Sequence, residues 1–212
     1  MAMGPREATS SRGPDDSAEV VTVARLERPK RHDILLKAVA ELRERRDVRL
    51  TIVGTGRDEG DLRALAHRLG IADAVNFTGF VRNPGEVLAR ADVFALATEY
   101  EGFGNVLVEA LACGLPVVVS DVPYGPAYII NDASLGTLVK PDSVESFALG
   151  LEDILLARPV TSPQRQAARS RASYFALDRI ALCFETLIEE RVIFLSAHRN
   201  GATTGPSRAV AP

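Results

Sequence analysis

Residues 93–120 read VFALATEYEGFGNVLVEALACGLPVVVS, and this stretch decides the fold class. It begins with an apolar run of strand length (93–97), continues through a glycine-containing loop and a helical pattern (106–112), and ends with a second apolar run (117–120). The second run is too apolar for a sheet with one face in water, so it is typical of a parallel strand covered on both faces. Two such strands separated by a helix predict a βαβ unit.

The same alternation repeats on both sides of this stretch. Further strands are predicted at residues 20–24, 48–53, 74–77 and 136–139, and further helices at 34–45, 61–69, 84–90, 125–131 and 143–157. In the first of these helices, Leu35, Ala38, Val39 and Leu42 recur at the spacing of one buried helical stripe. The chain is therefore predicted to fold as an α/β protein with a doubly wound, mainly parallel, Rossmann-like sheet.

Composition changes at both ends of the alternating region. Residues 1–17 and 199–212 are rich in small, polar, glycine and proline residues and are predicted to be disordered, whereas 18–158 form the Rossmann-like domain. Helical patterns without strands follow at 164–173 and 177–194, so C-terminal helices are expected over 159–198. Their apolar stripe is expected to pack back onto the domain; it consists of Leu177, Ile180, Ala181, Phe184, Leu187 and Ile188.

Composition excludes several classes of protein. The 212 residues are 46 % hydrophobic, enough for a core, and 25 Lys and Arg against 28 Asp and Glu give a net charge of −3, which argues against nucleic-acid binding by bulk positive charge. Two cysteines, Cys113 and Cys183, exclude a disulfide scaffold or a cysteine-rich zinc site. Because no apolar run is long enough to span a bilayer and no signal peptide is visible, a cytoplasmic location is expected.

The loop after residues 93–97 is the most informative part of the sequence, because ligands of parallel sheets bind at the carboxyl ends of strands. Gly102 and Gly104 allow a ligand to approach the main chain closely, and Asn105 is predicted to cap a helix that begins at Val106. The amides from Gly104 to Leu107 are then expected to point outwards as an anion cradle.

Two carboxylates flank this predicted cradle. Glu101 lies in the loop and Glu109 about one turn into the helix, and carboxylates accept hydrogen bonds from vicinal hydroxyls. A phosphate cradle between two hydroxyl acceptors suits a nucleotide-sugar. On spacing alone an alternative stays open, in which Glu109 only favours the helix dipole and the glycines form a tight turn.

Residues 101–121 also resemble the E-x7-E signature of retaining GT-B glycosyltransferases of family 4, also called group 1. The similarity continues, in order and with compatible spacing, in residues 24–26 with Lys30, 52–56, 77–80 and 91–94. It covers about residues 20–157. The resemblance implies one half of a GT-B fold, the C-terminal, donor-binding domain.

The resemblance also implies roles for individual residues. Glu101 would bind hydroxyls of the donor sugar and Glu109 those of the ribose, while the base would lie near Phe80 and Val81. Main-chain amides would meet the sugar and diphosphate at Gly102, Phe103, Gly104, Asn105 and Val106. Arg25 and Lys30 would neutralise the diphosphate as it leaves. Together with Glu101 they form the predicted catalytic set. The alternative is that the two cations are solvated surface charges.

Two positions depart from the family pattern. Arg31 stands where a glycine usually follows the basic residue, which would crowd or recharge the phosphate loop. Tyr128 occupies the position of a glutamate in a Gly-Pro-x-Glu block and receives no catalytic role. Both departures favour the alternative of a site that binds without turnover.

Other polar residues carry weaker signals. His32 follows the basic loop and is expected at the surface, with a phosphate contact as the alternative. The sequence has no Asp-x-Asp pair, no His-Glu-x-x-His and no Walker lysine motif. We therefore expect no metal and no cofactor apart from the nucleoside-diphosphate sugar itself.

The leading hypothesis is a glycosyltransferase donor-binding domain, incomplete and inactive as this chain alone. It would bind a nucleoside-diphosphate sugar and work with an N-terminal acceptor domain in the same or another chain. Peripheral contact with a membrane is compatible with this hypothesis and would be made by that acceptor domain. The alternatives are a non-catalytic nucleotide-sugar-binding module or split-enzyme subunit, and a GT-B-like sugar-nucleotide epimerase or hydrolase. An NAD dehydrogenase is disfavoured because no Gly-x-Gly-x-x-Gly follows the first strand. The base, sugar and acceptor stay open.

Overall fold

A computed structural model describes residues 17–157 and 159–199 of the chain. The ends predicted to be disordered, 1–17 and 199–212, lie almost entirely outside these residues. The chain divides into two compact units, 1–173 and 174–212, which are described separately.

The first unit is built on a six-stranded sheet whose strands are all parallel. The strands are β1 (Ala18–Val23), β2 (Val48–Val53), β3 (Val75–Gly79), β4 (Val93–Leu96), β5 (Val117–Ser120) and β6 (Gly136–Val139). Their order is β3-β2-β1-β4-β5-β6, so the direction of winding reverses between β1 and β4. This is the doubly wound, Rossmann-like sheet that the sequence predicts.

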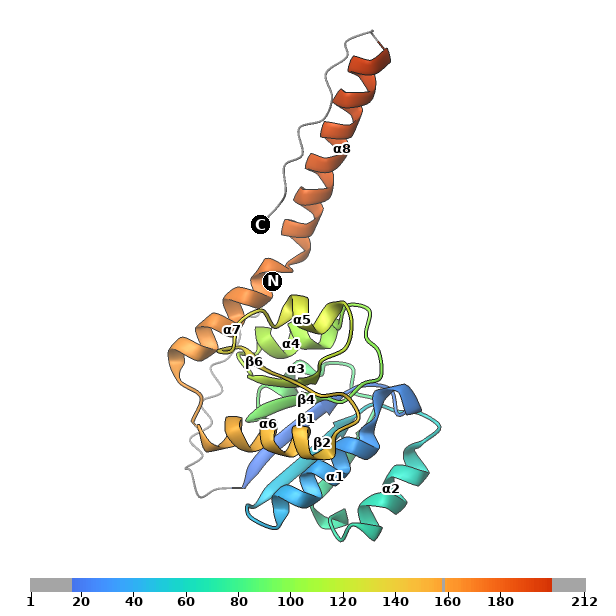
Figure 1. Ribbon diagram of the computed structural model, residues 1–212, viewed down its shortest axis with the longest axis vertical. Helices are drawn as coiled ribbons and strands as arrows, with labels where there is room; N and C mark the ends of the chain where they lie inside the picture. The colour runs from blue at the N-terminus through green and yellow to red at the C-terminus, as the bar shows by residue number, and fades with distance from the viewer. Residues whose placement is uncertain (1–16, 158, 200–212) are drawn as a thin grey trace. The chain divides into compact units, whose positions relative to one another are not determined.

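Helices cover both faces of the sheet (Figure 1). The helices that begin in this unit are η1 (Arg28–Lys30), α1 (His32–Arg43), α2 (Glu59–Arg68), η2 (Ala72–Ala74), α3 (Gly85–Leu88), α4 (Asn105–Ala112), α5 (Gly125–Ile129), α6 (Val144–Leu156) and α7 (Ser162–Tyr174). On one face α1 packs between α2 and α6, and on the other α4 packs between α3 and α5. The predicted elements are all present, with ends that differ by at most a few residues.

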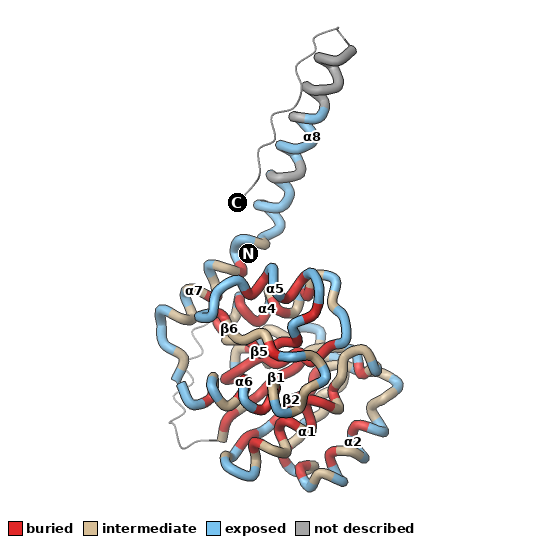
Figure 2. The backbone as a smooth tube through the Cα atoms, viewed as in Figure 1, coloured by how far each residue is buried: buried red, intermediate tan, exposed pale blue. Residues whose placement is uncertain are grey.

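The core lies between the sheet and the helices, where Figure 2 shows the buried residues. All four residues of β4 and of β5 are buried, as expected for central strands covered on both faces. Phe94 of β4 and Phe147 of α6 are among the largest fully buried side chains, and each contributes roughly 1.5–3 kcal/mol of hydrophobic stabilisation. This packing fixes the strands, and therefore the loops that follow them.

The second unit contains α8 (Leu177–Arg199). Four apolar residues of the predicted stripe, Leu177, Ile180, Leu187 and Ile188, are exposed, and the side chain of Phe184 lies outside the described set. The predicted packing of this stripe on the domain stays a prediction. Among the described residues, no helix combines the length and the apolarity that a bilayer-spanning segment needs.

Candidate functional site

Two loops meet at the point where the sheet reverses its winding. The first follows β1 and the second follows β4, the two strands that pair at this point. Glu99 donates its amide to the carbonyl of Pro29 at 2.8 Å, and the Thr98 hydroxyl donates to the same carbonyl at 3.1 Å. The carboxyl ends of β1 and β4 are therefore held together at the place where doubly wound sheets bind ligands.

Lys30 and Glu101 face each other across these loops. Lys30 Nζ donates a hydrogen bond to Glu101 Oε2 at 2.7 Å, and the side chains are 19 % and 18 % exposed. The structure thus brings together a predicted diphosphate cation and a predicted sugar carboxylate. Each of these two charges neutralises the other.

Arg25, the second predicted cation, lies at the surface. Its side chain is 76 % exposed, and its guanidinium is 3.4 Å from a carboxylate oxygen of Glu27. Surface pairs of this kind contribute at most about 1 kcal/mol, so Arg25 can turn towards an anion at little cost.

The glycines after β2 support the loop that carries Arg25. A Cβ on Gly54 would lie 2.0 Å from the carbonyl oxygen of Ala24, and one on Gly56 would lie 2.2 Å from that of Leu26. Leu26 also donates its amide to Thr55 at 3.0 Å. These glycines therefore allow two backbones to pack directly against each other.

The loop after β4 leads into α4 through a left-handed residue. Gly104 has φ 91° and is the N-cap, so α4 begins at Asn105 and the Asn105 side chain makes no capping hydrogen bond. The prediction that Asn105 caps a helix starting at Val106 is wrong, because the glycine takes the backbone conformation that ends the loop. Leu107 is also not part of an open cradle, since its amide donates to Gly104 at 2.8 Å.

Gly102 differs from the other glycines near the site. It has no positive φ, it is exposed, and a Cβ placed on it would have no neighbour within 4 Å. Folding therefore does not require a glycine here. Its lack of a side chain instead leaves the main chain beside Glu101 open to a ligand.

Three further predicted donor residues come after the carboxyl ends of β4 and β3 in the chain. Glu109 is exposed on α4. Phe80 directly follows β3, is 79 % exposed, and precedes the partly buried Val81. These residues follow strand carboxyl ends, as does the pair Lys30–Glu101.

Arg31 occupies a left-handed backbone position, with φ 37° and ψ 40°. Its guanidinium pairs with three carboxylates, those of Asp33 at 3.0 Å, Glu99 at 3.6 Å and Asp142. The hydrogen bond to Asp33 is the main cause of its raised pKa. Three carboxylates therefore compensate the charge of Arg31. This argues against the expectation that Arg31 adds positive charge to the phosphate loop.

His32 is buried, so the expectation of a surface histidine is wrong. It is the first residue of α1 and 3 % exposed, and its Nε2 has no hydrogen-bond partner among the described residues. Burial is the main cause that lowers its pKa to about 4. At neutral pH the ring is uncharged. No cluster of three His, Cys, Asp or Glu residues suited to a metal occurs in the described part of the chain.

Tyr128 takes part in packing between α5 and α7. The Arg171 guanidinium lies 5.6 Å from its ring centroid and donates hydrogen bonds to the carbonyls of Tyr128 and Ile129. The tyrosine thus has structural contacts where the family pattern has a carboxylate.

Tyr124 lies next to Glu101 in the fold, a proximity that the sequence does not reveal. It has φ 80° and is 84 % exposed, and its backbone forms an isolated parallel bridge with Glu101. The Pro-Tyr-Gly-Pro turn at residues 123–126 is the sequence signal that could have drawn attention to it.

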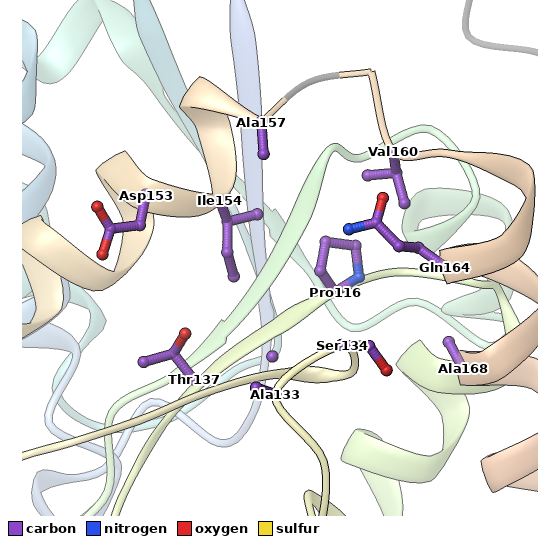
Figure 3. A pocket seen from close by; sticks show the side chains of 11 residues that line it. Pro116, Ala133, Ser134, Thr137, Asp153, Ile154, Ala157, Val160, Gln164 and Ala168 are labelled. Carbon is purple, nitrogen blue, oxygen red and sulfur yellow. The ribbon is translucent and has the colours of Figure 1, made fainter.

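A pocket of about 190 Å³ lies elsewhere (Figure 3). It opens beside Pro116 and Gly136, at the amino ends of β5 and β6, between Ile154 of α6 and Gln164 of α7. It is therefore at the opposite edge of the sheet from Lys30 and Glu101. Its lining is mostly small and apolar, and none of the predicted site residues contributes to it.

The chain matches a family profile described as glycosyl transferases group 1, over residues 5–173. Curated relatives include the N-acetylgalactosamine-N,N'-diacetylbacillosaminyl-diphospho-undecaprenol 4-alpha-N-acetylgalactosaminyltransferase of Campylobacter jejuni, 35 % identical over 76 % of this chain and 44 % of that protein. The D-inositol 3-phosphate glycosyltransferase of Segniliparus rotundus is 34 % identical over 96 % of this chain and 45 % of its own length. The chain spans less than half of these relatives.

Solved structures show the same similarity in three dimensions. The pneumococcal O-GlcNAc transferase GtfA, in complex with UDP and GlcNAc, has a TM-score of 0.75 at 26 % identity, over 87 % of this chain and 37 % of that one. HepE of Anabaena, in complex with UDP and glucose, has a TM-score of 0.73 at 25 % identity, over 82 % and 48 %.

Proposed function

This chain belongs to the glycosyl transferases group 1 family, and from that premise we propose that it is the donor-binding half of a retaining GT-B glycosyltransferase of family 4. In this proposal it binds a nucleoside-diphosphate sugar, and an N-terminal domain in the same or another chain holds the acceptor. The observation that carries the proposal is the meeting of Lys30 and Glu101 at the β1–β4 switch point, beside the start of α4.

The diphosphate would lie between the basic loop and the start of α4. Lys30 supplies a partly buried ammonium there, and Arg25 an exposed guanidinium that can turn inwards. The main-chain amides of Gly102–Val106 and the positive end of the α4 dipole add to the positive potential. Fixed positive charge at this point stabilises the negative charge that develops on the leaving diphosphate, without a metal ion.

The two glutamates and Phe80 would hold the rest of the donor. Glu101 accepts hydrogen bonds from the hydroxyls of the transferred sugar, and Glu109 from those of the ribose. Support for the first role comes from Gly102, which leaves the main chain beside Glu101 uncovered. The base would lie against Phe80 and Val81.

The reaction would proceed by departure of the diphosphate from the sugar. The bond between sugar C1 and the phosphate oxygen breaks, and its electron pair stays on the diphosphate. The acceptor hydroxyl oxygen then bonds to C1 on the same face, through an oxocarbenium-like state, and its proton passes to the leaving diphosphate. The new bond keeps the configuration of the donor sugar.

Isothermal titration calorimetry tests the donor-binding role without an acceptor. UDP, GDP and ADP, each with and without an attached hexose, are titrated into the 212-residue chain, and one of these nucleotides is expected to bind saturably at one site. Lys30→Met is expected to weaken that binding, whereas Lys37→Met, on the outer part of α1, is the matched control. If none of the six ligands binds saturably, or if the two lysine variants behave alike, the proposal is wrong.

A further inference from the structure

Tyr124 has a backbone conformation that tyrosine seldom adopts. Its φ is 80° and its ψ −107°, in a region where a side chain is strained and glycine is not. Among the described residues, Arg31 and Asp142 are the other non-glycine residues with positive φ, and their side chains pair with each other. Tyr124 is different, because the strained residue carries a large aromatic side chain, and this residue is 84 % exposed.

Burial in the core does not explain this tyrosine. A ring that is 84 % exposed gains little hydrophobic stabilisation to offset the strained backbone. Strained residues that persist in this way cluster at ligand-binding sites, where the strain places a side chain for a function.

The backbone of Tyr124 is held next to Glu101. The two residues form a parallel β-bridge, which places their main chains about 5 Å apart. The following residue, Gly125, packs so closely on the other loop that a Cβ would lie 2.1 Å from the carbonyl oxygen of Phe103. The loop after β5 is therefore fixed on the loop after β4, and the main chain at Tyr124 is held beside the main chain at Glu101.

A carboxylate and an aromatic ring side by side complement the two kinds of surface on a hexose. The carboxylate accepts hydrogen bonds from hydroxyls, and the ring packs on the apolar C–H face. We propose that Tyr124 contacts the transferred sugar of the donor and is a specificity-determining residue of the site. This inference rests on the proposed function, because it takes Glu101 as the ligand of the same sugar.

The inference is tested by the ratio of two dissociation constants measured by calorimetry, Kd for UDP divided by Kd for UDP-N-acetylglucosamine. GDP with GDP-mannose, and ADP with ADP-glucose, are measured in the same way, and the pair that binds wild type is used. A contact with the sugar alone affects only the second constant. Tyr124→Gly removes the ring and the strain together, whereas Tyr124→Phe keeps the ring and loses the hydroxyl.

Tyr124→Gly is expected to lower the ratio roughly threefold to tenfold, the range of a single aromatic contact. Its Kd for the nucleoside diphosphate alone stays within about twofold of wild type, and its Tm is unchanged or higher because the strain is gone. Tyr124→Phe keeps the ratio within about twofold, because the apolar ring face is intact.

Three results overturn the inference. An unchanged ratio in Tyr124→Gly would show that Tyr124 does not contact the sugar. An equal loss of affinity for both ligands would show that its role is structural. A lower ratio in Tyr100→Ala but not in Tyr124→Gly assigns the contact to the other exposed aromatic next to Glu101. In all three cases nucleotide still binds, so the proposed function stands; if wild type binds no nucleotide at all, the proposed function fails and the inference fails with it.

Discussion

Lys30 Nζ lies 2.7 Å from Glu101 Oε2, in an ion pair that joins loops 71 residues apart in the sequence. Both side chains are less than one-fifth exposed, so solvent screens the pair only in part. A diphosphate that binds Lys30 must therefore compete with Glu101. In the proposed complex the same carboxylate would have opposite effects on the two parts of the donor, because it would repel phosphate and bind sugar hydroxyls.

Glu101→Gln is expected to separate these two effects. Loss of the negative charge should tighten binding of the nucleoside diphosphate by roughly twofold to fivefold, equivalent to about 0.4–1 kcal/mol. The same variant should bind the nucleotide-sugar more weakly, because an amide accepts fewer hydrogen bonds from hydroxyls than a carboxylate. Calorimetry of both ligands gives the comparison. Equal changes in the same direction would show that Glu101 does not distinguish sugar from phosphate.

Substitution by alanine is expected to lower the free energy of unfolding at Gly56 but not at Gly102. A methyl group at Gly56 would lie 2.2 Å from the carbonyl oxygen of Leu26, so Gly56→Ala must displace backbone and should lower the free energy of unfolding by at least about 2 kcal/mol. Gly102→Ala meets no atom within 4 Å and should stay within about 0.5 kcal/mol of wild type.

Gly102 is expected to matter for ligand binding rather than for stability. Gly102→Ala should weaken nucleotide-sugar binding by roughly tenfold, about 1.4 kcal/mol, because its methyl group occupies the space left for the ligand. Urea unfolding and calorimetry measure the two quantities. A stable Gly102→Ala variant with wild-type affinity would mean that no ligand approaches the main chain at this residue.

Arg31→Gly is expected to leave nucleotide affinity within about twofold of wild type, no more than about 0.4 kcal/mol. Three carboxylates already compensate the guanidinium charge, those of Asp33, Glu99 and Asp142. Stability should change by less than about 1 kcal/mol, because relief of the left-handed backbone offsets the lost ion pairs. A large loss of affinity in calorimetry would instead assign Arg31 a direct role at the phosphates.

Burial of His32 predicts a pH dependence of stability. Its pKa is about 4 in the folded chain, below the ordinary value of 6.5, so the unfolded state binds a proton first as the pH falls. The contribution of neutral His32 to the free energy of unfolding is fully present above about pH 6.5. It decreases by on the order of 3 kcal/mol as the pH falls from about 6.5 to 4. Below about pH 4 both states are protonated, and the effect levels off.

The His32→Gln variant isolates this contribution from that of the carboxylates. Unfolding free energies of wild type and variant are measured by urea denaturation at several pH values between 4 and 7.5. The difference between the two proteins should shrink as the pH falls below 6.5. A difference that does not depend on pH would mean that His32 is not buried in its neutral form.

The sequence predicts the sheet well because its signal is the alternation of apolar runs and helical patterns, which core packing enforces. The site was predicted less completely. The sequence indicates both Lys30 and Glu101 as site residues, but only the three-dimensional fold makes them partners, since pairing of β1 with β4 is not local information. The errors at Asn105 and His32 have a similar cause. Gly104 takes the capping position because its backbone can be left-handed, and the burial of the His32 ring depends on tertiary packing at the start of α1.

Glu109→Ala is expected to weaken nucleotide binding about tenfold, or about 1.4 kcal/mol, the value of one charge-assisted hydrogen-bonded contact. Glu109 is exposed on α4 and eight residues after Glu101, so its removal should not disturb the fold. The sharpest control changes the ligand, because a nucleotide that lacks both ribose hydroxyls cannot make the contact. Wild type and Glu109→Ala should bind the 2′,3′-dideoxy nucleotide with equal affinity in calorimetry, and bind the ordinary nucleotide about tenfold differently. If the variant loses as much affinity for the dideoxy ligand as for the normal one, Glu109 acts through the helix dipole or the phosphates, and the ribose role is wrong.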